Sequence, residues 1–178
     1  APLAQAYQAS SLLWMYECLR DIGSGDTVAT FGDDTGAKVC ALIHLVSAIA
    51  MGTEHADIVM KIGAAFWGLN GLRNVIDPSG ALAAWNMKKK FPAAAQDRLL
   101  GNVKEFGTFL VSYCLFLGTQ LFLEGTSPAK AWGYAIAPYF LLNLKYFFDG
   151  TYKKYGVGLE KMTPWLIFQV LTVATLLF

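Results

Sequence analysis

Long apolar stretches with very few charges alternate along this chain with short clusters of charged residues, and this segregation restricts its possible folds more than any other feature. A helix that crosses the roughly 30 Å core of a bilayer needs about 20 predominantly apolar residues. Four stretches approach that length, at 37–52, 58–74, 106–123 and 129–148, and a fifth at 163–178 is somewhat short. The sequence therefore predicts an all-α integral membrane protein with about five transmembrane helices.

The amount and the distribution of charge agree with this prediction. Charged residues make up 15% of the chain, against about 25% in an average soluble domain. In the five-span arrangement, twelve of the fourteen lysines and arginines lie on one side, and only Lys61 and Lys130 lie on the other. The positive-inside rule puts the basic side, with the N-terminus, toward the cytoplasm or its organellar equivalent. The net charge of +1 gives no reason to expect a nucleic-acid partner.

The expected helices form a single membrane domain, 1–178. Its layout is an N-terminal interfacial segment at 1–36, a first helical hairpin at 37–74, a basic surface loop at 75–105, a second hairpin at 106–148 and a C-terminal helix at 163–178. The interfacial segment should contain a helix at 2–22 that lies in the membrane surface. Glycines and aspartates at 23–36 predict an irregular connection after it. In the basic loop, a short surface helix is expected at 79–90.

The two hairpins come into register when the chain is shifted by 73 residues. Gly52 and Thr53 then fall on Gly125 and Thr126, and Asn70 falls on Asn143. An internal duplication would explain this match. The alternative is that tight helical hairpins use Gly-Thr for turn chemistry alone, and the sequence leaves both explanations open.

His44 is the most informative single residue, because an ionisable side chain near the middle of a membrane span usually has a specific role. It lies in a stripe of small residues at helical spacing: Ala37, Cys40, Ala41, Ala48 and Gly52. Such a stripe is typical of a helix-packing seam, and this is the favoured interpretation. The alternative is an axial ligand to a tetrapyrrole such as chlorophyll. A bis-histidine haem is disfavoured because the only other histidine, His55, lies at a hairpin tip.

Polar amides in the other spans are further candidate pigment ligands. Asn70, Gln120 and Asn143 could each bind a chlorophyll magnesium through the amide oxygen, as could Gln169. The favoured alternative is that these amides form hydrogen bonds between helices. Cys40 and Cys114 are interpreted as small apolar helix residues.

Searches for catalytic signatures find no H-x-x-x-H metal pair, no G-x-S-x-G elbow and no phosphate-binding loop in the sequence. We therefore expect a non-catalytic accessory subunit of an organellar membrane complex, in contact with lipids and with other membrane subunits. A photosystem or antenna supercomplex in the thylakoid, with chlorophyll or carotenoid contacts, is preferred to a respiratory complex of the mitochondrial inner membrane. A small transporter, channel or quinone-interacting enzyme is the alternative class, with His44, Asn70 and Asn143 lining a cavity.

Overall fold

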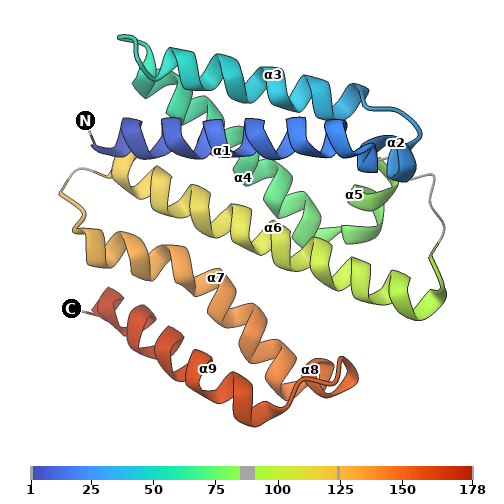
Figure 1. The fold of residues 1–178 in the computed structure, drawn as a ribbon. Helices are drawn as coiled ribbons and strands as arrows, with labels where there is room; N and C mark the ends of the chain where they lie inside the picture. Colours follow the sequence, from blue (N-terminus) through green and yellow to red (C-terminus); the bar gives the residue numbers. More distant parts are fainter. Residues whose placement is uncertain (1, 85–90, 124, 178) are drawn as a thin grey trace. The chain divides into compact units, whose positions relative to one another are not determined.

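The computed structural model describes residues 2–84, 91–123 and 125–177, and the regular structure within these ranges is entirely helical. The α-helices are α1 (Pro2–Ser24), α2 (Asp26–Phe31), α3 (Thr35–Ala50), α4 (Ala56–Ile76), α5 (Pro78–Ala84), α6 (Ala93–Phe122), α7 (Pro128–Phe148), α8 (Thr151–Lys154) and α9 (Leu159–Ala174). A single 3₁₀ turn, Thr175–Leu177, follows α9. The all-α prediction is confirmed for the described part of the chain (Figure 1).

The chain divides into two compact units, each described separately. The first comprises Ala1–Gly63 and Leu82–Pro92, and the second comprises Ala64–Ala81 and Ala93–Phe178. Helix α4 contributes residues to both units.

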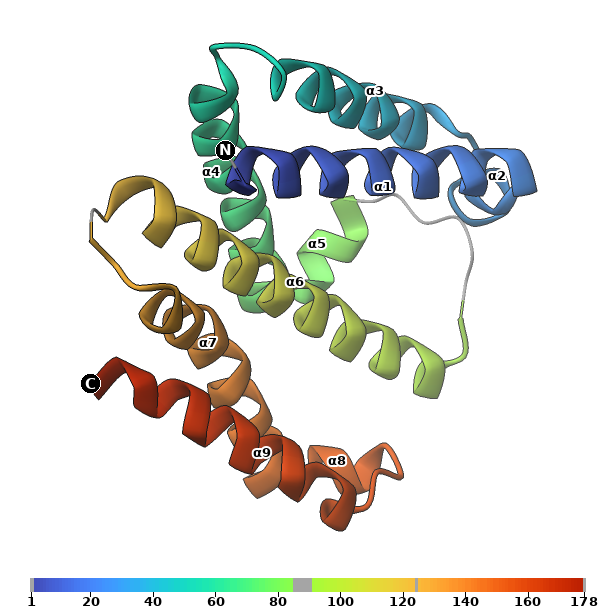
Figure 2. The same cartoon turned by 60° about the vertical axis from the view of Figure 1, so that its left-hand side comes forward.

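In the first unit, α1 and α3 lie side by side and antiparallel (Figures 1 and 2). The Gln8 side chain donates a hydrogen bond to the carbonyl oxygen of Ala48 over 2.8 Å. Further along, the Trp14 ring stacks on His44. The residue numbers rise on α1 while they fall on α3, as an antiparallel pair requires. The predicted N-terminal helix is thus confirmed as a helix, and its position in the membrane interface stays a prediction.

The second unit is built around the 30-residue helix α6. Helix α7 packs against α6, as expected for the second hairpin, and α9 packs against α7. The α7–α9 contact is antiparallel, since the Thr175 hydroxyl donates to the carbonyl oxygen of Ala129 over 3.1 Å at one end. Further along α7, Asn143 bonds to Gln169, which lies earlier in the sequence than Thr175. The second half of α4 crosses α6 where Gly71 meets Gly107.

Helix α6 begins at Ala93, whereas the sequence analysis began the span at 106 and assigned the preceding residues to a surface loop. The segment 93–100 reads Ala-Ala-Ala-Gln-Asp-Arg-Leu-Leu, which is rich in strong helix formers. Pro92 directly precedes it, in a position compatible with the start of a helix. Asp97 and Arg98 make this segment too polar to be recognised as part of a membrane span, but they do not prevent it from forming a helix.

The connection expected at 23–36 contains the six-residue helix α2. Gly25 and Gly32 flank this helix with φ angles of 77° and 90°, a left-handed conformation that glycine adopts at little cost. These glycines therefore delimit a helix, and the prediction of an entirely irregular connection is wrong.

The short helix predicted at 79–90 corresponds to α5, which begins at Pro78 and ends at Ala84. Asp77 starts it by accepting a hydrogen bond from the backbone N–H of Gly80 over 2.8 Å. This bond, with a second from Ser79, lowers the pKa of the exposed Asp77 carboxyl. The remainder of the predicted helix, including Trp85, lies outside the described residues.

Among the described helices, one stretch, Ala95–Phe122, is long and apolar enough to cross a membrane, and the apolar helix Thr35–Ala50 is shorter. One such helix is weak evidence for a membrane protein, because core helices of soluble proteins have the same length and composition.

The 73-residue shift also relates whole helices. It carries 56–76 onto 129–149, one residue from the bounds of α7, and α4 and α7 both have 21 residues. Each of the two is followed by an aspartate and a short helix. These matches extend the sequence observation, while duplication itself stays a prediction.

Candidate functional site

The seam between α1 and α3 is lined by small and polar side chains. On α3 the buried residues are Ala41, His44 and Ala48, at helical spacing. On α1, Tyr7 and Ser11 are buried. Small side chains allow two helix backbones to approach closely. The stripe seen in the sequence is therefore a packing face in this structure, with His44 inside it.

His44 is only 6% exposed. Its imidazole lies against the indole of Trp14, with ring centroids 6.3 Å apart and ring planes inclined by 15°. Protein groups thus occupy the surroundings in which a tetrapyrrole would have to lie, and α1 would have to move for a pigment to reach the imidazole. This geometry favours the seam interpretation, and ligation of a pigment by His44 stays a prediction.

Cys18 and Cys40 meet across the same seam, where the Cys18 thiol is close enough to interact with that of Cys40. Both thiols are free and partly buried. This pair was not predicted from the sequence, because α1 was expected to lie in the membrane surface, away from α3. The signal was present in the spacing, since an antiparallel pairing of residue 14 with residue 44 brings residue 18 to residue 40.

A second polar cluster joins three helices of the second unit. The Asn143 amide of α7 donates to Oε1 of Gln169 on α9 over 3.1 Å. The Tyr152 hydroxyl of α8 donates to Oδ1 of Asn143 over 2.5 Å. Gln169 and Tyr152 are both buried. For Asn143 and Gln169 the structure therefore shows the hydrogen bonds between helices that the sequence analysis favoured over magnesium ligation.

The surroundings of the Tyr152 hydroxyl keep it protonated, so that it can donate this hydrogen bond. Burial, reinforced by the Glu105 carboxylate and by Tyr139, raises the pKa of Tyr152 to about 12. The adjoining Lys154 forms an ion pair with Asp97 near the start of α6. The hydrogen bond in this pair raises the pKa of the exposed lysine. Helix α8 is thus held by a neutral hydrogen bond on one side and an ion pair on the other.

Asn70 and Gln120 take no part in this cluster's recorded hydrogen bonds. Asn70 is half-buried, and its amide donates to the carbonyl oxygen of Phe66 in its own helix over 2.8 Å. The Nε2 atom of Gln120 is buried, with no hydrogen-bond partner among the described residues.

No protein-family model, curated protein or solved structure shows significant similarity to this chain. The functional argument therefore rests on the distribution of its own side chains.

Proposed function

We propose that this chain is a non-catalytic helical subunit of a multi-subunit membrane complex in an organelle. The observation that carries the proposal is an inverted distribution of side chains, with large apolar groups outside and small or polar groups in the helix seams. Such an arrangement is unfavourable in water, where monomeric proteins rarely expose large contiguous apolar patches. It suits lipid and partner helices, where seams of small and polar residues hold helices together.

The contrast is large. Among the described residues, thirty-three large hydrophobic residues (Val, Leu, Ile, Phe, Tyr or Trp) are exposed, whereas six residues of these types are buried: Tyr7, Val103, Leu110, Leu117, Tyr146 and Tyr152. Eight buried residues are polar or charged. The apolar surface needs cover from lipid acyl chains or from neighbouring subunits.

Helix α3 shows the inversion within a single element. The face toward α1 carries Ala41, His44 and Ala48. The exposed positions of the same helix carry Val39, Leu42, Ile43, Leu45, Val46 and Ile49. A surface helix of a soluble protein has the opposite polarity, with its apolar stripe facing the core.

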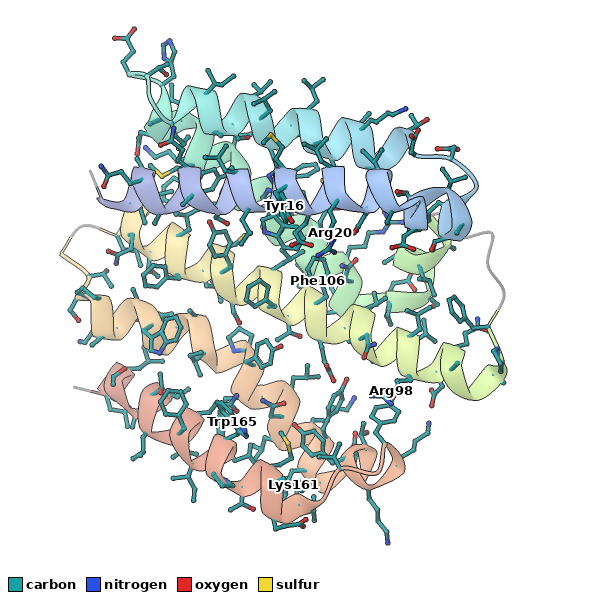
Figure 3. The ribbon with its side chains drawn as sticks, viewed as in Figure 1. Tyr16, Arg20, Arg98, Phe106, Lys161 and Trp165 are labelled. Atoms are coloured by element: carbon teal, nitrogen blue, oxygen red, sulfur yellow. The ribbon has the colours of Figure 1, made fainter. Side chains whose placement is uncertain are left out.

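Exposed aromatic residues one turn from basic residues support a membrane setting. Tyr16 and Arg20 form such a pair on α1, and Lys161 and Trp165 form another on α9 (Figure 3). Trp165 is 62% exposed. Aromatic rings and long cationic side chains are enriched at the level of lipid headgroups. We place these two pairs at the membrane–water interface.

The proposal retains the five spans at α3, α4, α6, α7 and α9, and the α1–α3 contact adds a constraint. Because α1 lies along α3, the two helices share an orientation. If α3 crosses the bilayer, α1 crosses beside it as a sixth helix instead of lying flat in the interface. Residues 2–16 of α1 and 39–50 of α3 carry no charge. At 1.5 Å per residue these segments span about 20 Å, which is shorter than the bilayer core and requires local thinning or a covering partner.

Membrane extraction and native electrophoresis test this proposal. We expect the chain to stay in the membrane pellet after alkaline carbonate treatment, because apolar burial holds it there. After mild detergent solubilisation it should migrate with a much larger assembly on a native gel. Release into the carbonate supernatant would contradict membrane insertion, and migration only as a small free particle would contradict the subunit role.

The preference for a thylakoid photosystem, with chlorophyll or carotenoid, depended on His44 as a possible ligand. The absorption spectrum of the purified parent complex tests it through His44→Leu. If His44 binds a chlorophyll, the variant should lose one pigment equivalent and the corresponding band. An unchanged pigment content would remove His44 as a ligand, while the subunit proposal would stand and a respiratory complex would become the preferred assembly.

A further inference from the structure

The two thiols at the charged end of the α1–α3 seam are the strongest unexplained feature of the chain. The Cys18 thiol is close enough to interact with that of Cys40, and neither thiol is in a disulfide. They come from different helices and are separated by 22 positions in the sequence. Their contact is therefore a product of tertiary packing.

The register of the helix pair supports this contact independently. Gln8 bonds to Ala48, and Trp14 stacks on His44. Continuing this antiparallel register toward the C-terminus of α1 brings residue 18 opposite residue 40. The small residues of the seam let the backbones approach closely, as a disulfide requires, since its two Cα atoms are usually about 4.4–6.8 Å apart.

We infer that Cys18 and Cys40 are a redox-active pair that forms a reversible disulfide pinning α1 to α3. A low-molecular-weight disulfide such as oxidised glutathione is the oxidant. The Cys18 thiolate attacks one of its sulfurs, forming a mixed disulfide and releasing one thiolate. The Cys40 thiolate then attacks the Cys18 sulfur and releases the second. The protein pair loses two electrons and two protons, and the oxidant becomes two thiols.

The covalent link would change how α1 is held. In the reduced chain, α1 is joined to α3 through the connection that contains α2 and through non-covalent seam contacts. In the oxidised chain, a second covalent connection would close the loop from residue 18 to residue 40, so α1 could not separate from α3. This inference does not depend on the membrane proposal, because thiol contact within the first unit is sufficient.

The test uses the whole purified chain treated with oxidised glutathione. Remaining thiols are then labelled with a maleimide under denaturing conditions and identified by peptide mass spectrometry. We expect labelling to fall from three thiols to one, Cys114, with a linked peptide joining Cys18 to Cys40 that dithiothreitol separates. Three labelled thiols, or glutathione left on the cysteines without a linked peptide, would overturn the inference.

A matched variant shows whether the link depends on the seam. In the Cys18→Ser, Leu19→Cys double variant, α1 keeps one cysteine at nearly the same position along the helix axis. Leu19 is exposed, so the new thiol lies on another face of the helix. We expect no link to Cys40 in this variant, and Cys114→Ser should link as the natural chain does. Equal linking through position 19 would show non-specific oxidation and would also overturn the inference.

Discussion

Gly107→Ala is expected to destabilise the second unit, whereas Gly118→Ala in the same helix should leave its stability unchanged or raise it. A Cβ atom at residue 107 would lie 2.5 Å from the Cβ of Asn74 and 2.6 Å from the carbonyl oxygen of Gly71. Both atoms are fixed to the α4 backbone, so no side-chain rotation can relieve the contact. The helices must separate, which costs about 3 kcal/mol as overpacking. Alanine recovers only about 1 kcal/mol through helix propensity.

The net expectation for Gly107→Ala is thus a loss of about 2 kcal/mol in the free energy of unfolding. At Gly118, a Cβ atom would meet nothing within 4 Å, so only the gain of up to about 1 kcal/mol applies. Reversible unfolding by denaturant in detergent micelles, followed by circular dichroism, measures both changes. Equal midpoints for the two variants would show that the α4–α6 crossing is not close-packed.

Gly71→Ala provides a second approach to the same crossing. Its Cβ would lie 2.8 Å from the Gly107 carbonyl oxygen and 2.8 Å from the Leu110 Cβ. Either substitution alone forces α4 away from α6. The double variant should therefore lose less stability than the sum of the two single losses, because residues in one contact are not additive.

Local properties of the sequence were sufficient to predict most helices. Apolar stretches at 37–52, 58–74 and 129–148 correspond to α3, α4 and α7. The C-terminal helix begins at Leu159, four residues before the predicted start at 163. Pro164 lies inside this helix, where a proline removes one intrahelical hydrogen bond. Length and hydropathy are local quantities, and they indicate where helices lie.

Helix pairing is a tertiary property and was harder to predict. The stripe containing His44 was identified as a packing face, but nothing in α3 alone shows that α1 is its partner. The same gap hid the contact between Cys18 and Cys40. The interfacial position of α1 stays a prediction; it was based on polar residues of which Ser11 and Gln8 lie in the seam.

The candidate amides illustrate the same distinction between residue type and environment. Asn70 and Asn143 occupy equivalent positions at a shift of 73 residues, so the sequence offers no basis for separating them. In the structure, the Asn70 amide bonds to the carbonyl oxygen of Phe66 within its own helix. Asn143 bonds to two other helices. This difference provides a matched pair for the second major prediction.

Asn143→Leu is expected to cost about 2 kcal/mol of unfolding free energy, and Asn70→Leu less than about 0.5 kcal/mol. Removing Asn143 leaves the Tyr152 hydroxyl and the Gln169 amide buried without the partner that each now has. Leaving such groups unsatisfied costs about 1–3 kcal/mol. Removing Asn70 releases only the carbonyl oxygen of Phe66, at an exposed position. Denaturant unfolding in micelles compares the two variants directly.

A triple variant separates a structural role of Asn143 from pigment binding. If the Asn143 amide stabilises the fold through its hydrogen bonds with Tyr152 and Gln169, then adding Tyr152→Phe and Gln169→Leu to Asn143→Leu should recover most of the lost stability. Replacing all hydrogen-bonding partners by apolar groups of similar shape is often nearly neutral. If Asn143 instead binds a magnesium, the added substitutions cannot restore the ligand, and the stability and the pigment content should both stay low. Recovery of stability without pigment loss would establish the cluster as a helix-bridging element.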